Sequence, residues 1–462
     1  PDFTKAHEIQ QEQIAQLILQ QIEVWTLRRD METLELDRKR LNSLLTKSLP
    51  PEHQAAIVFT DIQGSTSLWE VDSNAMHDAL VLHDTIMRKF CAEHHGYEIS
   101  TEGDAFHFAF HDSVDAVSFA IKAQEALYDA PWSDEILALQ DACDDGRGFR
   151  GLRVRIAIHF GDVTSHVNEV SGRLGYVGKT VCIAKSLENI AHGGQILVSA
   201  DAWNVASYAV ESNLGSPQVV DLGMHVLWTG MAPNEGIIAK GVVQIVPSQL
   251  AFDYFANSKP AETVADANDV QLKECRAKGR LFPPPTTTKR LSASFHEAPH
   301  ANNLVTMVFI YTSEVEKLSN DPSVLLAALA KLIGSLVVEC GGYQSKNFML
   351  AFHNPSEAVT FGLTLQESTN DRPVADVNLA GLIKIGIHEG TFTSMGPHSS
   401  TGRADYFGKV VNRAARIAGA AEPGRVYLGT TNAEKPQLQS GLEAIFVGWR
   451  DLKGVQEQMA LF

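Results

Sequence analysis

The feature that most limits what this chain can fold into is an internal repeat. The segment 113–126, SVDAVSFAIKAQEA, matches 355–368, PSEAVTFGLTLQES, and the shared Ala, Val, Phe, Gln and Glu recur at helical spacing. Shorter matches keep the same order along the chain: GYE with GYQ, AFH with AFH, RIAIHFG with KIGIHEG, and YVGKTV with YFGKVV. A repeat that holds its order over most of 462 residues indicates one domain that has been duplicated.

Each copy has the same predicted order of elements: strand, helix, strand, strand, helix, strand. This order predicts an α+β fold in which one mostly antiparallel sheet carries helices on one face. We expect the first domain at 51–247, lengthened by an acidic, Gly-containing insertion near 129–151, and the second at 303–462. The linker between them, 248–302, contains FPPPTTTKR and scattered Ser and Ala.

The first segment, 1–50, is predicted to be one long polar helix that ends at a Pro-Pro pair. Leucines at heptad spacing, as in a short coiled coil, occur at Leu27, Leu34 and Leu41. Two roles remain open. The helix is either a signalling stalk that makes the protein a homodimer, or it packs back on its own domain. Because the chain starts at Pro1 rather than Met, we expect a piece of a longer polypeptide whose remainder could hold a sensor or a membrane domain.

Composition excludes several classes of function. The chain carries 38 Lys and Arg against 55 Asp and Glu, a net charge of −17, so nucleic acid and anionic membrane surfaces are not expected as main partners. Its five cysteines are scattered and form no C-x-x-C pair, which favours a reducing, cytoplasmic setting. No uninterrupted apolar run approaches the roughly 18 residues of a membrane-spanning helix.

Two acids of the first copy stand where a binding site could form. The stretch AAIVFTDIQGSTSLWE, 55–70, ends a buried β-type run on a carboxylate, Asp61, and a second acid, Asp104, lies in the turn of the STEGDAF hairpin. Pairing of these strands would bring the two carboxylates together. Taken singly, Asp61 could instead cap a helix and Asp104 could belong to an ordinary Gly-Asp turn. In the second copy Tyr311 replaces Asp61, and the shorter hairpin GYQSKNFMLAF has no counterpart of Asp104.

Four motifs, FTDIQGST, TEGDAF, IHFGDV and DYFGKVVNRAAR, together resemble the class III nucleotidyl cyclases, which make cyclic AMP or cyclic GMP. The resemblance implies two ferredoxin-like βαββαβ domains packed head to tail. Cyclisation requires the ribose 3′-hydroxyl to attack the α-phosphorus while pyrophosphate leaves, and two metal ions held by hard carboxylates suit that chemistry. We therefore expect Asp61 and Asp104 to hold two Mg²⁺, for which Mn²⁺ could substitute. The family pattern adds the Ile62 carbonyl as a metal ligand, and the backbone amides of four residues as contacts to the triphosphate: Gln63, Gly64, Ser65 and Thr66.

The second copy keeps the complementary residues. In ADYFGKVVNRAAR, the resemblance assigns base selection to Asp405, ribose orientation to Asn412 and stabilisation of transition-state charge to Arg416. Asn412 and Arg416 lie one helical turn apart, so both can reach one substrate. The alternatives are a helix cap and a solvated surface arginine. The matching positions of the first copy cannot do these jobs; they are Gly175, Cys182 and Ser186.

The remaining residues concern the base and the phosphates. In this family a lysine donates to adenine N1 and an aspartate accepts from the exocyclic amine, so Lys346 and Asp405 point to ATP. Lys346 could also be an ordinary surface lysine. Arg173 and Lys453 match the family's phosphate-binding cations, and Trp228 stands near the position of Lys453 in the first copy.

The resulting prediction is a cytoplasmic adenylate cyclase with a single site between its two domains. The first copy supplies the metal ligands, and the second supplies the base, ribose and transition-state contacts. Two alternatives stay open: a guanylate cyclase, and a non-catalytic nucleotide-binding regulatory module.

Overall fold

The computed structural model describes most of the two predicted domains. The described residues are 29, 31, 49–146, 148–167, 172–228, 236–253, 279–286, 290–312, 315–318, 322–432 and 434–462. The predicted coiled coil falls almost wholly outside the described residues, as does the middle of the predicted linker.

The first domain is built on a seven-stranded sheet with the order β2-β3-β1-β4-β7-β9-β8. Neighbouring strands are antiparallel except β4 and β7, which are parallel. The strands are β1 (Gln54–Ile62), β2 (Tyr97–Glu102), β3 (Ala105–Phe110), β4 (Val154–Asp162), β7 (Ile196–Ser199), β8 (Gln218–Trp228) and β9 (Ile237–Val246).

The second domain repeats this sheet in the order β11-β12-β10-β13-β16-β18-β17. Again one neighbouring pair, β13 with β16, is parallel, at the position that β4 and β7 occupy in the first sheet. The strands are β10 (Leu304–Tyr311), β11 (Tyr343–Lys346), β12 (Met349–Phe352), β13 (Lys384–Thr391), β16 (Val426–Thr430), β17 (Gly448–Arg450) and β18 (Met459–Leu461). The shared order confirms that one fold occurs twice.

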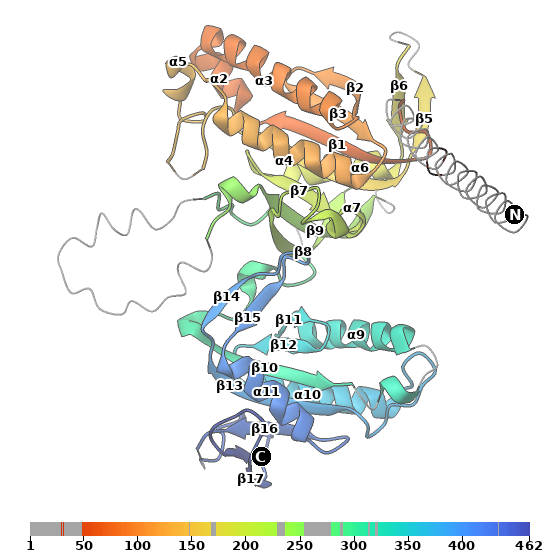
Figure 1. The fold of residues 1–462 in the computed structure, drawn as a ribbon, viewed down its shortest axis with the longest axis vertical. Coiled ribbons are helices and arrows are strands. Elements are labelled where there is room, and N and C mark those ends of the chain that lie inside the picture. The colour runs from red at the N-terminus through yellow and green to blue at the C-terminus, as the bar shows by residue number, and fades with distance from the viewer. Residues whose placement is uncertain are drawn as a thin grey trace, which may run out of the picture.

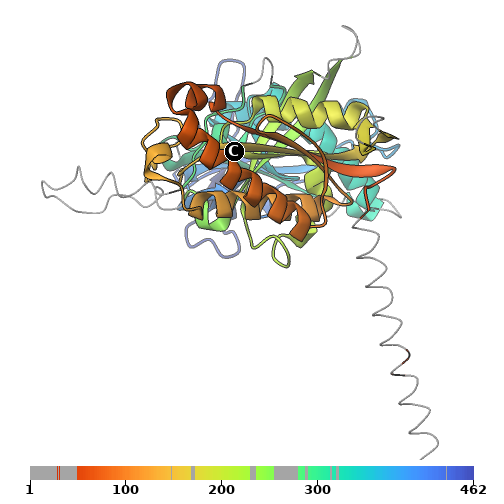
Figure 2. The same ribbon diagram turned by 90° about the horizontal axis from the view of Figure 1, so that it is seen from above.

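Helices cover both faces of each sheet, not one face as predicted from the sequence (Figures 1 and 2). The longer helices are α3 (Ser73–Glu93), α4 (Ser113–Asp129), α6 (Lys179–Ile190), α9 (Pro322–Glu339), α10 (Pro355–Asp371) and α11 (Lys409–Ala420). The shorter ones are α2 (Ser65–Val71), α5 (Asp134–Leu137) and α7 (Ala200–Ala206), with 3₁₀ turns at Ser207–Ala209, Ser248–Leu250, Phe295–Glu297, Ala301–Asn303 and Glu316–Leu318.

Strand β1 explains the two covered faces. Its alternate residues Ala56 and Val58 pack in the core beneath α3 and α4, whereas Ile57 and Phe59 pack with α6 on the other side. Because both sets are apolar, the sequence of β1 is a continuous hydrophobic run rather than an alternating one. The prediction of one covered face missed this consequence.

The helices beneath each sheet begin at matching caps. The Asp112 side chain accepts a hydrogen bond from the Asp115 amide at the start of α4, and Asn354 does the same for the Glu357 amide at the start of α10. In α4, Phe119 then lies 5.2 Å from the Phe108 ring in an edge-to-face contact. A buried phenylalanine of this kind contributes about 2 kcal/mol of hydrophobic stabilisation.

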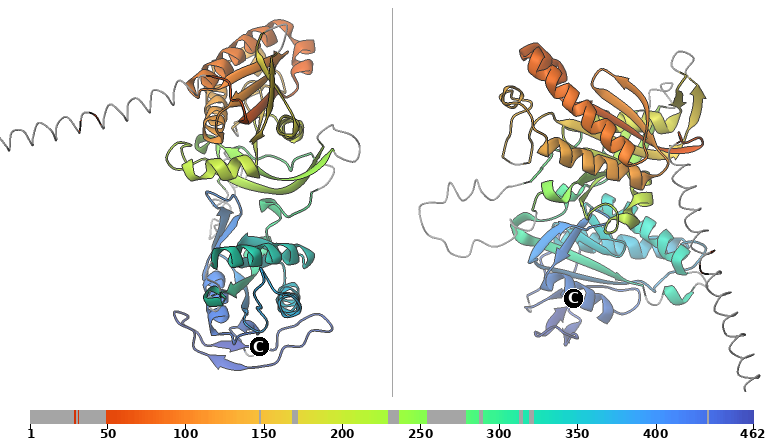
Figure 3. Two further views of the ribbon diagram at one scale, coloured as in Figure 1. Left: turned by 90° about the vertical axis from the view of Figure 1, so that its right-hand side faces the viewer. Right: turned by 45° about the horizontal axis from the view of Figure 1, so that its top comes forward.

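The β14–β15 hairpin of the second domain, β14 (Ser394–Pro397) with β15 (Ala404–Phe407), reaches β8 of the first (Figures 1 and 3). The Asp221 amide donates to the Gly402 carbonyl at 3.0 Å, and Arg403 Nε lies 3.3 Å from Asp221 Oδ2. The Trp203 indole nitrogen donates to the Ser400 carbonyl at 2.6 Å. The matching hairpin of the first domain, β5 (Thr164–Val167) with β6 (Leu174–Val177), extends away from the second domain.

Helix α9 passes a length and composition test for a membrane span, alone among the described helices. Lys331 interrupts its apolar sequence. The buried side of the helix packs in the core of the second domain through Leu325, Leu329, Ile333, Leu336 and Val337. Core helices of soluble domains share this length and composition.

Candidate active site

Strand pairing brings the two predicted metal ligands together. Asp61 is the last residue but one of β1, and β3, which pairs with β1, follows directly on the turn that contains Asp104. The Ile62 amide donates to Asp104 Oδ2 at 3.3 Å. Gly103 makes this tight turn in a left-handed conformation, with φ of 66°. Two carboxylates and the carbonyl end of β1 therefore meet at one edge.

The charges around Asp61 come from its own domain. Burial raises the pKa of Asp61, and the neighbouring Arg155 opposes that rise, whereas Glu188 and Asp104 add to it. Arg155 lies opposite Asp61 in the register of β1 and β4, and its Nη2 is 3.0 Å from Asp61 Oδ2. The buried Glu188 of α6 lies 3.4 Å from Arg155 Nε and 2.8 Å from Lys185 Nζ.

Arg155 and Glu188 were missed by the sequence analysis, although the repeat holds a signal for the first. Where Asp61 faces Arg155, the second copy has Tyr311 facing Lys384 at the same register. Lys384 Nζ lies 5.6 Å from the centre of the Tyr311 ring. Both members of this facing pair therefore differ between the copies, Tyr311 standing for Asp61 and Lys384 for Arg155. A comparison of facing residues in the two copies would have found the pair.

The donor atoms at this edge fit a hard divalent cation. Carboxylate and carbonyl oxygens are the ligands that Mg²⁺ prefers, and Asp61, Asp104 and Ile62 supply both kinds. The Asp104 carboxylate adds to the rise in the pKa of Asp61, and negative charge of this kind beside a carboxylate favours a bound cation. Within the described chain no group of three or more His, Cys, Asp or Glu side chains gathers as a metal site.

The loop after β1 is shaped for close approach. Gly64, with φ of 74°, starts α2 without a side-chain cap, and a Cβ there would lie 2.9 Å from Asp141 Oδ2 in the insertion. The Gln63 amide donates to the Arg153 carbonyl at 2.9 Å, and Gln63 Oε1 accepts from the Gly193 amide at 2.6 Å. Ser65 is half-buried and Thr66 exposed, at the start of α2.

The two residues predicted to select the base also meet. Lys346 Nζ, at the end of β11, lies 3.0 Å from Asp405 Oδ1 of β15. The lysine is half exposed, and the aspartate side chain is 13% exposed. Lys346 borders a cavity of about 1120 Å³ between the domains, with apolar walls from the second domain at Phe309, Met349 and Val411. The pair is therefore placed beside a space large enough for a nucleotide base.

Helix α11 carries the two residues predicted to contact the ribose and the transition state. Asn412 and Arg416 are both exposed on it. Asn412 borders a small cavity of about 270 Å³ with Arg413 and the loop 454–457. Lys453, which is exposed, comes directly before that loop, and Arg413 is paired with Glu457 at 2.7 Å. In the first domain the matching helix α6 has Cys182 half-buried and Ser186 buried.

The structure does not bring the two halves of the predicted site together. Among the described residues, the contacts join Asp61 to Asp104 and Lys346 to Asp405, and none joins one pair to the other. The first-domain walls of the cavity beside Lys346 come from α7, β8 and β9 rather than from β1 and β3. Arg173, before β6, lies 6.0 Å from the Tyr97 ring of the first domain.

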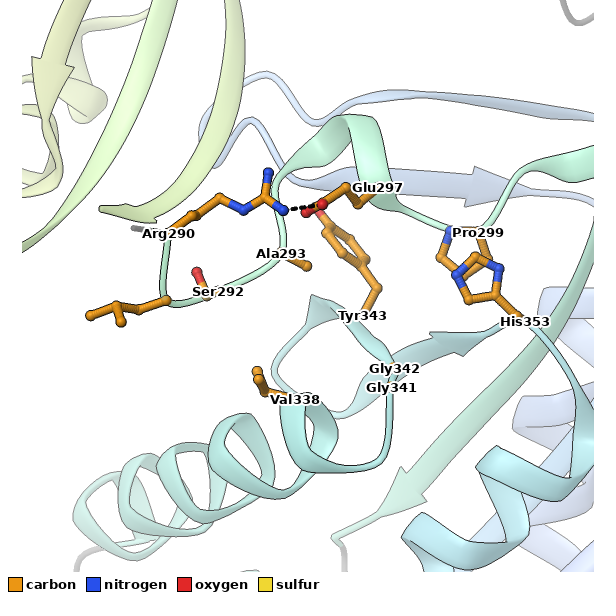
Figure 4. A pocket seen from close by; sticks show the side chains of 11 residues that line it. Arg290, Ser292, Ala293, Glu297, Pro299, Val338, Gly341, Gly342, Tyr343 and His353 are labelled. Carbon is orange, nitrogen blue, oxygen red and sulfur yellow. Dashed lines mark hydrogen bonds and ion pairs between the residues drawn. The ribbon is translucent and has the colours of Figure 1, made fainter. Parts of the chain in front are cut away.

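A third cavity, of about 340 Å³, lies where the segment 290–299 packs against α9 and β11 (Figure 4). Arg290 and Glu297 form an ion pair at its edge, and Tyr343 and His353 are among the residues that line it. None of the residues predicted for the active site borders it. This cavity is therefore separate from the candidate active site.

Comparison with known proteins identifies the class of domain. The family model described as the adenylate and guanylate cyclase catalytic domain matches residues 48–220 and again 292–462. These two matches fall on the two sheets, and the carboxylate pair and the lysine–aspartate pair lie within them. The chain therefore belongs to the family of adenylate and guanylate cyclase catalytic domains.

The curated relatives are much longer than this chain. An adenylate cyclase of Lachancea kluyveri is 39% identical over 166 residues, 35% of this chain and 9% of the relative. One from Schizosaccharomyces pombe is 34% identical over 209 residues, 41% of this chain and 12% of the relative. One from Mycosarcoma maydis is 39% identical over 179 residues, 38% of this chain and 7% of the relative. The matched part thus spans about a tenth of their length.

Solved structures match single domains. A structure of adenylate cyclases from Trypanosoma brucei in their monomeric state has 25% identity and a TM-score of 0.37, and covers 42% of this chain and 89% of the solved chain. The guanylate cyclase domain of a Catenaria anguillulae protein, solved with GTP, has 17% identity and a TM-score of 0.33, with 42% and 97% covered.

Proposed function

We propose that this chain is an adenylate cyclase that converts ATP to cyclic AMP and pyrophosphate. The observation that carries the choice of substrate is the ion pair between Lys346 and Asp405 at the base cavity. Lysine donates to adenine N1, and aspartate accepts from the exocyclic amine, whereas guanine presents the reverse pattern at those atoms. The adenylate cyclases among the curated relatives support the same choice.

The remaining residues take complementary roles in one site. Asp61, Asp104 and the Ile62 carbonyl hold two Mg²⁺ ions, with Mn²⁺ as a substitute. The ions when bound activate the 3′-hydroxyl and neutralise charge on the phosphates. Asn412 orients the ribose, and Arg416 stabilises the charge that develops on the α-phosphate.

The phosphates are bound by contacts from both domains in this proposal. The amides of residues 64–66 meet the triphosphate at the start of α2, whereas the Gln63 amide donates to the Arg153 carbonyl and would have to exchange that partner for a phosphate. Arg173 and Lys453 add positive charge. Lys453 directly precedes the loop that borders Asn412, which supports a shared task for the two residues.

A single shared site requires the β1–β3 edge to meet the end of the second domain that carries Lys346 and Asp405. We propose that this happens within one chain, by a shift of the second domain away from its contact with β8. The contact includes the polar groups of Asp221 and Trp203, and also an apolar cluster in which Val220 and Leu222 of β8 are buried together with Tyr343 of the second domain. The proposed shift therefore requires these apolar side chains to repack. We further propose that the pair of domains works in the cytoplasm as part of a longer signalling protein, since the relatives are about ten times as long as the matched segment.

The test is turnover of ATP and of GTP by the whole chain with Mg²⁺ or Mn²⁺, with the cyclic nucleotide and pyrophosphate both measured. We expect cyclic AMP, a strong preference for ATP, and loss of that preference in Lys346→Ala. Cyclic GMP as the main product would establish the guanylate cyclase alternative. Nucleotide binding without either product would establish a non-catalytic module.

A further inference from the structure

An arginine from the segment between the domains is buried in the first domain. Arg280 follows the undescribed residues 254–278, and only 4% of it is exposed. Its amide donates to the Leu250 carbonyl at 2.7 Å, so the chain returns beside the end of the first domain. Burial lowers the pKa of Arg280 to about 10, which leaves the guanidinium charged at neutral pH. A buried charge is costly unless it is well bonded.

The Arg280 guanidinium is bonded to three separate parts of the first domain. Nε donates to the Gly148 carbonyl of the insertion at 2.7 Å. Nη1 donates to Gln124 Oε1 of α4 at 2.6 Å and to the Gly194 carbonyl at 2.9 Å. The guanidinium carbon also lies 5.2 Å from the centre of the Phe149 ring. Such a set of charge-assisted bonds fixes the turn at Gly194 firmly.

That turn is the support of the loop after β1. Gly193, the residue before Gly194, donates its amide to Gln63 Oε1 at 2.6 Å. A Cβ on Gly193 would lie 2.8 Å from the Gln63 Cβ and 2.7 Å from the Arg153 Cβ, so the turn rests directly against the loop. A continuous path of short contacts therefore runs from Arg280 through residues 193–194 to Gln63.

The second domain keeps this arrangement but lacks the arginine. Gln366 is the counterpart of Gln124, and its Nε2 donates to the Ile383 carbonyl at 2.6 Å, as Gln124 Nε2 donates to the Val154 carbonyl. Gln366 Oε1, however, is buried and has no hydrogen-bond partner among the described residues. The arginine is thus present beside the copy that keeps the loop and the two acids, and missing from the copy that has lost the acids.

We propose that Arg280 is a positioning residue for the triphosphate-binding loop 63–66, which it holds through the turn at Gly193 and Gly194. The segment between the domains then supports the loop 63–66 of the first domain in addition to connecting the two domains. The expected effect of Arg280 on KM rests on the function proposed above, whereas its expected effect on the mobility of the loop does not. Because the loop amides contact phosphates in both the bound substrate and the transition state, a loosened loop weakens both equally and raises KM more than it lowers kcat.

The mechanical test is hydrogen exchange of the full chain, read from peptides that cover 60–68. In Arg280→Ala we expect these amides to exchange at least about tenfold faster, with exchange in β10 and β13 unchanged. Arg280→Lys keeps the positive charge but loses the planar guanidinium that donates to several carbonyls at once, so it should give a smaller effect. It also provides the test if the alanine variant does not fold. Arg290→Ala is the matched control, because that arginine of the same segment pairs with Glu297 instead.

A second control separates the effect of Arg280 from the effect of the length of the segment that precedes it. Replacing 256–276 by a short Gly-Ser stretch should leave exchange in 60–68 unchanged, since Leu250 and Arg280 already hold the two ends together. The proposal is overturned if this variant behaves like Arg280→Ala, if exchange in 60–68 is unchanged in Arg280→Ala and Arg280→Lys, or if exchange rises equally throughout the domain.

The kinetic test compares the same variants with ATP. We expect Arg280→Ala to raise KM about tenfold and to change kcat by less than about threefold, with Arg290→Ala unchanged. Faster loop exchange with unaltered KM would overturn the kinetic part. If the wild-type chain forms no cyclic nucleotide, the proposed function fails, and the exchange result alone decides whether Arg280 holds the loop.

Discussion

Replacing Arg155 tests whether Asp61 holds a cation. In Arg155→Met the aliphatic part of the side chain is retained and the charge is removed. The loss leaves Asp61 beside two other acids, Glu188 and Asp104, with Lys185 as the remaining cation near Asp61. A metal ion at Asp61 would replace the missing charge. The stability of this variant should therefore depend on metal far more than that of the wild type does.

The magnitude follows from the geometry. Two unit charges 3.0 Å apart attract by about 5 kcal/mol at an effective dielectric constant of 20. Desolvation and solvent screening reduce the net value, because the Arg155 and Asp61 side chains are 23% and 29% exposed, so we expect a loss of about 2 kcal/mol without metal. Metal stabilises both proteins by binding to the folded state, so only tighter binding by the variant reduces the difference between them. Removal of the competing arginine should tighten metal binding about tenfold, which at saturating metal restores about 1.4 kcal/mol.

The loss should also depend on pH. Burial already holds the pKa of Asp61 in the folded protein above its ordinary value of 3.8, and removal of Arg155 raises it further, since the arginine lowers it. A raised carboxyl pKa destabilises the folded protein once pH rises through that pKa, and it costs nothing when the group is protonated in both states. The loss in Arg155→Met should therefore be full at pH 7 and shrink as pH falls toward 3.8.

The assay is urea unfolding of wild type and Arg155→Met at pH 7, in chelator and in excess MnCl₂. We expect a loss of about 2 kcal/mol in chelator and of less than about 1 kcal/mol with Mn²⁺. Arg88→Met is the control, because Arg88 pairs with Asp84 and Glu98, each at 3.1 Å, and not with Asp61. Its loss should be the same with and without metal. An equal loss in both conditions for Arg155→Met would refute the assignment of Asp61 as a metal ligand.

Three further predictions concern the metals, the first segment and the assignment of the site to one chain. Asp61→Ala or Asp104→Ala should abolish cyclic nucleotide formation without a change in circular dichroism, because a two-metal reaction fails without either acid; substantial Mg²⁺-dependent turnover would contradict this. Deleting 1–47 should change the basal rate or its control and leave the preference for ATP intact; unchanged activity and mass in solution would favour a helix that packs on its own domain. Mixing Asp61→Ala chains with Arg416→Ala chains should restore no activity if the site forms within one chain, whereas recovery would show that it forms between two chains.

The repeat made most of the fold predictable. Because both copies follow one pattern, the strand order of one sheet implied that of the other, and the motif positions placed Asp61 beside Asp104 and Lys346 beside Asp405. The first pair follows from the pairing of β1 with β3 and from the tight turn that precedes β3. The second pair joins β11 to β15, which lie in separate sheets, so the family resemblance and not strand register predicted it. The continuous apolar sequence of β1 also indicated that helices cover both faces of the sheet, because no alternate set of its residues is polar.

The missed residues depend on contacts that no local pattern fixes. Arg155 faces Asp61 only because β4 pairs with β1 across about ninety intervening residues. Arg280 reaches its three partners only after the segment between the domains has returned to the first domain. The relative placement of the domains likewise follows from contacts such as Arg403 with Asp221, which sequence spacing does not encode.

The central claim is that one catalytic site draws its metal ligands from the first copy and its transition-state cation from the second. The most direct measurement compares turnover and ATP affinity of Arg416→Ala with those of Ser186→Ala, the matching position in the first copy. We predict that Arg416→Ala lowers kcat by about a hundredfold or more with little change in ATP binding, because it removes a donor aimed at developing charge, and that Ser186→Ala stays near wild type. Near-normal turnover in Arg416→Ala would contradict the claim, since the first copy would then be catalysing the reaction without the second.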